Sequence, residues 1–207
     1  PSASLPLSLL QGPVPKRFWF GTPDDVWIVQ LQHDLLLVNW RRRGEAEYPR
    51  FVEVGPRFQV AQQALLKALE SGRLTGSRVR QVEVLYVNWI TDLSLATWFR
   101  PAEAATLTGS RVAHEPEVSA WSAFHGITDA EGAALGRLKI ECQSAARLDG
   151  AHWVDGTQLS LRARLAVQDL ALTDDVMGFF DDGRNAIVQA FTDLTTTRAH
   201  THWGRTK

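Results

Sequence analysis

The sequence has one cysteine, Cys142, and a formal net charge of only −1 over its 207 residues. A lone cysteine excludes an internal disulfide, a cysteine-rich zinc site and an iron–sulfur cluster. The balanced charge gives no overall attraction to nucleic acid or to an anionic membrane. No apolar stretch approaches 18 residues, and the first residues lack the pattern of a signal peptide. We therefore expect a cytoplasmic protein with no membrane partner.

Catalytic signatures are missing as well. The sequence contains no GxSxG, GxxxxGK, GxGxxG or HExxH motif. His200 and His202 are two residues apart, which on a helix points their side chains roughly 200° apart and excludes a shared metal. Cys142 lies on the inward face of an alternating strand, where a free cysteine behaves as a small hydrophobic residue. We expect no cofactor and no metal, and the sequence assigns no catalytic residue.

The segment from Val26 to Arg42 predicts a β-hairpin with a two-residue turn at His33–Asp34. This turn places three apolar cross-strand pairs on one face of the hairpin: Leu31–Leu36, Val29–Val38 and Trp27–Trp40. Continued outward, the same register predicts Asp25 beside Arg42 and Asp24 beside Arg43.

Hydrophobic periodicity predicts the other elements. Helices are expected at 56–71, with Pro56 as the first residue, and from Asp181 or Asp182 onward, followed by a short helix capped by Thr197. Alternation predicts strands at 79–90, 118–124, 134–144 and 159–167, with Asp149–Gly150 and Asp155–Gly156 as turn signals between the last two. The end of the 79–90 strand is apolar on both faces, so we expect it at the centre of the sheet.

These elements predict an α+β fold. We expect a single mainly antiparallel sheet of about six strands with two long helices packed on one face, in the order β-β-α-β-β-β-β-α. Its prolines make residues 1–16 a Pro-rich extended arm. Residues 17–207 are expected to form a single α+β domain, with a long excursion at 91–116.

Eight tryptophans are the unusual part of the composition. Trp98, Trp121 and Trp153 lie at expected strand ends or in loops, where no local packing partner can be identified. Tryptophan at such places seals the edge of a core or anchors an interface. These three residues are our candidates for a protein-partner interface.

A second candidate surface is the cluster of Arg41, Arg42, Arg43 and Arg50. Trp40 and Tyr48 lie nearby in sequence and could stack on bases. The competing interpretation is a strand end whose arginines pair with Asp24 and Asp25 and otherwise face solvent. Both interpretations stay open, so nucleic acid is a second partner class to consider.

Several stretches taken together resemble the sporadically distributed bacterial proteins grouped as the TIGR04255 family. The resemblance spans about residues 17–51, 79–90 and 184–205, and is carried by Arg17–Phe20, Val29–Asp34, Val38–Arg41, Tyr48–Phe51, Val82–Asn88, Phe191–Thr196, His200 and Trp203–Arg205. The resemblance implies a bacterial cytoplasmic protein of no assigned activity. The patchy distribution of that family is typical of accessory genes, such as those of phage defence or toxin–antitoxin loci.

We therefore expect a non-enzymatic binding or assembly module of a bacterial accessory system, acting through protein–protein contacts as a homodimer or with another protein. One alternative is a nucleic-acid-binding accessory factor that uses Arg41–Arg43. Another is an enzyme with a site on the concave sheet face, which would require a deep polar pocket holding two of four residues: Glu83, Tyr86, Asn88 and His125.

Overall fold

The computed structural model describes residues 16–44, 48–74, 76–91, 98–100, 120–149 and 151–203. The chain divides into two compact units, Pro1–Ser77 (the N-terminal unit) and Arg78–Lys207 (the C-terminal unit). The expected arm falls almost wholly outside the described residues, as does most of the expected excursion at 91–116. The division into an arm and a single domain at 17–207 stays a prediction.

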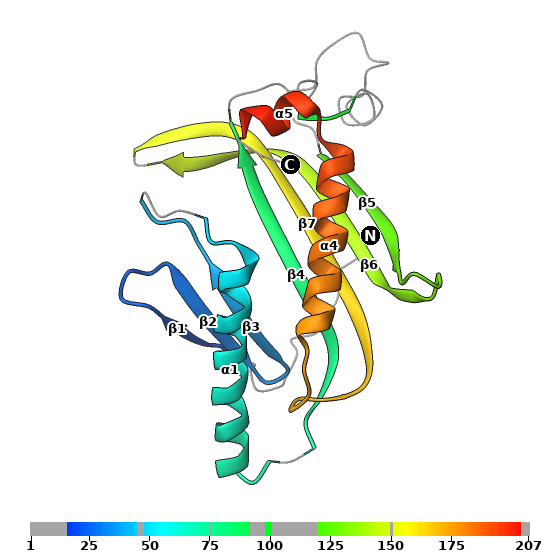
Figure 1. Ribbon diagram of the computed structural model, residues 1–207. Helices are drawn as coiled ribbons and strands as arrows, with labels where there is room; N and C mark the ends of the chain where they lie inside the picture. The colour runs from blue at the N-terminus through cyan, green and yellow to red at the C-terminus, as the bar shows by residue number, and fades with distance from the viewer. Residues whose placement is uncertain are drawn as a thin grey trace, which may run out of the picture. The chain divides into compact units, whose positions relative to one another are not determined.

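The N-terminal unit is a three-stranded antiparallel sheet with one helix (Figure 1). Its strands are β1 (Phe18–Gly21), β2 (Trp27–Gln32) and β3 (Leu35–Trp40), in the spatial order β1-β2-β3. Helix α1 (Phe51–Ser71) packs against β3. The predicted register of the β2–β3 hairpin is confirmed from Trp27–Trp40 to Gln32–Leu35. Sequence periodicity missed β1 because its four residues are exposed on both faces.

Helix α1 begins five residues before its predicted start. The chain turns into the helix at Arg50, whose backbone N–H donates to the Glu53 carboxylate at 3.4 Å. Such a reach back from the third helical residue satisfies a backbone donor that the helix itself leaves free. Pro56 therefore lies inside the helix. Because proline has no N–H, the carbonyl of Val52 receives no helical hydrogen bond from position 56; Val52 is exposed, so this carbonyl can accept from water instead.

The C-terminal unit is a four-stranded antiparallel sheet with helices on one face (Figure 1). The spatial order is β4-β7-β6-β5, and the strands are β4 (Arg78–Ile90), β5 (Ala120–Thr128), β6 (Ala134–Asp149) and β7 (His152–Ala171). Helix α4 (Met177–Leu194) covers β4 and β7, and the short helix α5 (Thr197–His202) follows it. Alternate residues of β7, from Leu159 to Leu165, are fully buried beneath α4.

The expected single sheet of about six strands is wrong, because the strands form two sheets of three and four strands. The α+β class and the antiparallel pairing are confirmed. Alternation along a strand shows which side chains turn toward a hydrophobic core, but it does not show to which core they belong. Here each sheet packs against a helix of its own unit, so the strands are divided between two cores.

Strand β4 lies at an edge of its sheet and not at the centre. Its apolar residues Leu85 and Val87 are 42% and 55% exposed, on the face opposite α4. The sequence pattern was misleading here because these residues resemble those of a strand that is buried on both faces.

Other boundaries also differ from prediction: β5 lies at Ala120–Thr128 and not at 118–124, and β6 extends to Asp149. Helix α4 begins at Met177, four residues before the predicted aspartates, where the Asp175 carboxylate accepts from the Met177 N–H at 2.8 Å. Helix α5 is capped by Thr196 and not Thr197, since the Thr196 hydroxyl accepts from the Ala199 N–H at 3.2 Å. Strand β7 runs through the predicted turn at 155–156. Among the described residues, none of the helices is long and apolar enough to cross a membrane.

Candidate functional site

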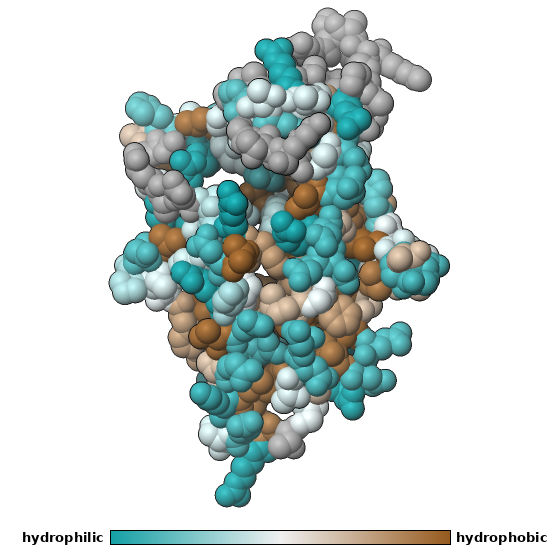
Figure 2. All heavy atoms as spheres, in the orientation of Figure 1, coloured by the Kyte–Doolittle hydropathy of each residue, from teal (hydrophilic) through white to brown (hydrophobic). Residues whose placement is uncertain are grey.

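The face drawn in Figure 2 mixes hydrophobic and hydrophilic residues without one broad apolar area. A shallow hollow runs along α1, lined on that helix by Pro56, Gln59, Val60, Gln63, Ala64 and Lys67. Those side chains offer one charge, on Lys67, and two amides, on Gln59 and Gln63. Candidate sites must therefore be found in smaller groups of residues.

The strongest candidate is the far end of the β6–β7 hairpin, which extends past both neighbouring strands. Pairing between β4 and β7 ends at Ile90–Thr157, and pairing between β5 and β6 begins at Ala120–Gln143. Residues 144–149 and 152–156, which we call the ribbon, therefore pair only with each other in the described sheet. In Figure 1 the ribbon is the hairpin that projects beyond the end of β4.

Two large apolar side chains lie exposed at the tip of the ribbon. Leu148 and Trp153 form a direct cross-strand pair, and their exposed fractions are 59% and 71%. By alternation both side chains project on the α4 side of the sheet, beyond the part that α4 covers. An indole and an isobutyl group thus share one exposed surface.

The base of the ribbon is firmly packed. A Cβ placed on Gly156 would lie 2.8 Å from the Ile90 carbonyl oxygen and 2.8 Å from the Trp89 ring, so the ring lies directly on the glycine. On the same ring the Arg147 guanidinium lies 5.4 Å from the centroid. This packing explains why Asp155–Gly156 does not form the turn that its sequence suggests: the glycine makes room for Trp89.

The other two candidate tryptophans belong to the interior of the C-terminal unit. Trp98 is 1% exposed and stacks on Trp203, with ring centroids 4.0 Å apart. The Trp98 carbonyl accepts from the Thr196 N–H at 2.8 Å, which ties this segment to the α4–α5 corner. Trp121 is half-buried and packs against the same core. Of the three, Trp153 alone offers most of its surface to solvent.

Thr195 is the polar centre of the α4–α5 corner. It is 1% exposed, and its hydroxyl lies 2.6 Å from His200 Nε2 while also donating to the Phe191 carbonyl. These contacts stabilise the corner. The neighbour of His200 Nε2 is therefore a hydroxyl group, and not a second residue of the kind that binds a metal ion. Among the described residues no group of His, Cys, Asp or Glu is arranged to hold a metal ion.

The arginine cluster is partly neutralised, though in a different pairing from the predicted one. Asp25, and not Asp24, receives both Arg41 and Arg43: it forms a close ion pair with Arg41, and its Oδ2 accepts from Arg43 Nε and Nη2 at 2.9 and 2.8 Å. The left-handed backbone of Asp25 (φ 57°) turns its carboxylate between them. Arg42 and Arg50 are exposed.

Asp24 instead serves the turn before β2. The Thr22 hydroxyl and then the Val26 N–H donate to its carboxylate, and these hydrogen bonds lower the pKa of Asp24 below its usual value. The Asp24 carboxylate is therefore held within the turn.

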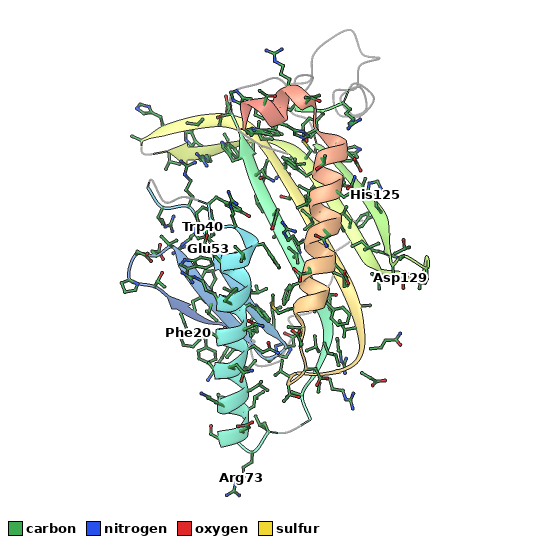
Figure 3. The ribbon with its side chains drawn as sticks, viewed as in Figure 1. Phe20, Trp40, Glu53, Arg73, His125 and Asp129 are labelled. Atoms are coloured by element: carbon green, nitrogen blue, oxygen red, sulfur yellow. The ribbon has the colours of Figure 1, made fainter. Side chains whose placement is uncertain are left out.

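The four residues proposed for an enzymatic site do not converge. Glu83 faces the side of the sheet opposite α4, whereas Tyr86 and Asn88 face α4. His125 lies on β5, at the other edge of the sheet (Figure 3), about 14 Å from β4 across three strand spacings. Burial raises the pKa of the Tyr86 hydroxyl, and Arg184 partly opposes that rise. The α4 side of the sheet is filled by apolar side chains.

The face of the four-stranded sheet opposite α4 carries a group of charges, which the alternation of β6 and β7 also predicts from the sequence. We call it the open face, because α4 packs on the other face of this sheet. Its register sets Arg137 opposite Arg164 and Lys139 opposite Arg162. Adjacency of this kind depends on strand pairing and cannot be read from any one segment. Three buried donors in the described residues lack acceptors, namely Trp89 Nε1, Trp98 Nε1 and Arg162 Nε.

Comparisons with family models, with curated proteins and with solved structures found no match to this chain.

Proposed function

We propose that the protein is a non-enzymatic binding and assembly module that joins a second copy of itself through the ribbon. The observation that carries the proposal is the exposed Leu148–Trp153 pair at the tip of a hairpin that extends past its sheet. Exposed tryptophan beside an aliphatic residue is typical of the anchors that dominate protein interfaces.

Energetics favour covering this tip. A two-stranded hairpin outside a larger sheet is only marginally stable in water. Burying a large apolar side chain contributes roughly 1.5–3 kcal/mol, and a symmetric contact between two copies would bury both copies of each tip residue. The base of the ribbon is fixed by the packing of Trp89 on Gly156 and of Arg147 on the Trp89 ring. The orientation of the tip relative to its sheet is therefore defined.

A second copy is a suitable occupant of the ribbon. A second copy presents the same exposed Leu148–Trp153 pair, so an isologous contact would pack each pair against its counterpart. The net charge of −1 gives little repulsion between copies. Membership of the sporadic bacterial family stays a prediction; it would place this assembly in an accessory system.

The arginine cluster gives weaker support to nucleic-acid binding. Asp25 engages Arg41 and Arg43, so the cluster offers fewer free cations than its sequence suggests. The ribbon is therefore the better-supported surface.

Sedimentation velocity over a concentration series tests the proposal. We expect the wild-type protein to shift from monomer toward dimer as concentration rises, and Trp153→Ser and Leu148→Ser to shift that transition to much higher concentration. Phe124→Ser is the matched control, because Phe124 is 65% exposed on the open face, away from the ribbon tip. A wild-type protein that stays monomeric at all concentrations, or a control that dissociates equally, contradicts the proposal.

A further inference from the structure

The open face carries a compact group of four cations. Arg137 and Lys139 on β6 lie directly opposite Arg164 and Arg162 on β7, and we call these four residues the basic block. Neighbouring strands are about 4.8 Å apart, and residues two apart in a strand are about 6.8 Å apart, so the block is a small, flat lattice of positive charge.

The basic block is unfavourable for folding. Like charges directly opposite each other destabilise an antiparallel pair, and here two such pairs follow in succession. Two carboxylates offset part of the charge: Glu83 contacts Arg162 at 3.2 Å and Arg164 at 2.6 Å, and Glu141 contacts Lys139 at 2.7 Å. Within the described residues Arg137 has no ion-pair partner. Four cations and two carboxylates leave the face positive on a chain whose net charge is −1.

Apolar side chains flank the block on both sides. On β5 the ring of Phe124 is 65% exposed, and the Lys139 ammonium lies 5.6 Å from its centroid. On β4 the exposed side chain of Leu85 lies directly opposite Arg162, and the exposed Val87 lies opposite Ser160. One row across the sheet therefore contains an aliphatic side chain, two cations and an aromatic ring, in the order Leu85, Arg162, Lys139 and Phe124.

We propose that the open face binds single-stranded nucleic acid, with phosphates on the basic block and a base stacked on Phe124. Sheet faces that combine cations with exposed aromatic rings bind single strands in this way. A duplex hides the faces of its bases, so it would give Phe124 nothing to stack on. A second copy would bring one positive block against another, so charge complementarity favours a polyanion over self-association here.

Fluorescence anisotropy with labelled oligo(dT) and oligo(U) at low salt tests the proposal. We expect binding that weakens with salt, and an affinity at least tenfold lower for the double variant Arg137→Gln/Lys139→Gln. Its salt dependence should fall by up to about 1.4 in log–log slope, at about 0.7 for each phosphate that the variant no longer neutralises. Phe124→Leu should also weaken binding, because it removes the stacking ring while keeping an apolar side chain.

The control removes the same charge elsewhere. Lys67→Gln/Arg198→Gln neutralises one exposed lysine and one exposed arginine outside both the block and the arginine cluster, and should leave binding close to wild type. Thermal melting shows that each variant is folded. The proposal is overturned if neither oligonucleotide binds at low salt, if the control loses as much affinity as the block variant, or if polyglutamate displaces the oligonucleotides as well as unlabelled oligo(dT) does. The last result would assign the face to acidic proteins instead.

Discussion

At the scale of single residues, Gly156 determines how the ribbon leaves the sheet. Its Cα lies against the Trp89 ring and the Ile90 carbonyl, and any side chain there would force one of them to move. Tight packing of this kind makes small-to-large changes costly. The same ring lies next to Arg147, so a shift at Gly156 would loosen the ribbon base as a whole.

We therefore expect Gly156→Ala to destabilise the C-terminal unit by about 1–3 kcal/mol, measured by denaturant unfolding. Gly126→Ala is the control, because a Cβ at Gly126 would meet no heavy atom within 4 Å. If the two variants unfold at the same denaturant concentration, the close packing of Trp89 on Gly156 is not maintained in solution.

Cys142 provides a second prediction at this scale. Burial raises the pKa of its thiol to about 11, from an ordinary value of 9.0, because the thiolate is poorly solvated in the core. The native protein should therefore react very slowly with a disulfide reagent at pH 8, and the denatured protein rapidly. Stability should also fall as the pH rises from about 9 toward 11, because the folded state keeps a proton that the unfolded state releases. Equal reaction rates in the native and denatured proteins would show that the thiol is accessible.

At the scale of elements, the α4–α5 corner depends on one buried hydroxyl. Thr195 joins the end of α4 to His200 on α5, and its backbone pairs with Phe99 beside the stacked Trp98. Two helices and a separate segment thus meet around the Thr195 hydroxyl, beside an aromatic cluster.

Thr195→Val tests this contact, because it keeps the shape of the side chain and removes its hydroxyl. We expect a loss of about 1–3 kcal/mol in unfolding free energy, since the buried hydroxyl hydrogen bonds to the part-buried His200 ring and to the Phe191 carbonyl are both removed. Thr197→Val, at an exposed position on α5, should change the stability by much less. A Thr195→Val variant as stable as the wild type would mean that the hydroxyl contributes nothing to the corner.

How well the sequence predicted an element depended on how local its determinants are. The β2–β3 hairpin was predicted to the residue, because a two-residue turn and three apolar pairs fix one register. The start of helix α4 was predicted too far along the chain. Asp181 and Asp182 are as suitable for an N-cap by sequence as Asp175, which accepts from the Met177 N–H in the structure. The partition into two sheets was missed, since partner choice depends on packing between segments distant in sequence.

The candidate sites follow the same rule. Trp153 could be singled out because a lone tryptophan near a turn is visible in sequence, but its exposure and its pairing with Leu148 required the extended hairpin. The basic block required the register of β6 and β7, which brings Arg137 and Arg164 together across 27 positions of sequence.

At the scale of the whole molecule, the C-terminal unit has two separate surfaces with different chemistry. The ribbon tip is apolar, which suits a protein contact, and the open face is positive, which suits a polyanion. Because the surfaces use different residues, changes to one should leave the other unaffected. Phe124→Ser should leave self-association unchanged, and Trp153→Ser should leave oligonucleotide affinity unchanged at protein concentrations where the protein is monomeric.

The most direct test of the central claim is site-specific photo-crosslinking at the ribbon tip. With p-benzoylphenylalanine in place of Trp153, irradiation of the purified protein should give a covalent dimer whose crosslink maps to residues of the ribbon in the second copy. The same group in place of Phe124, also an exposed aromatic residue, should give little dimer. No dimer from position 153, or an equal yield from both positions, would contradict the account.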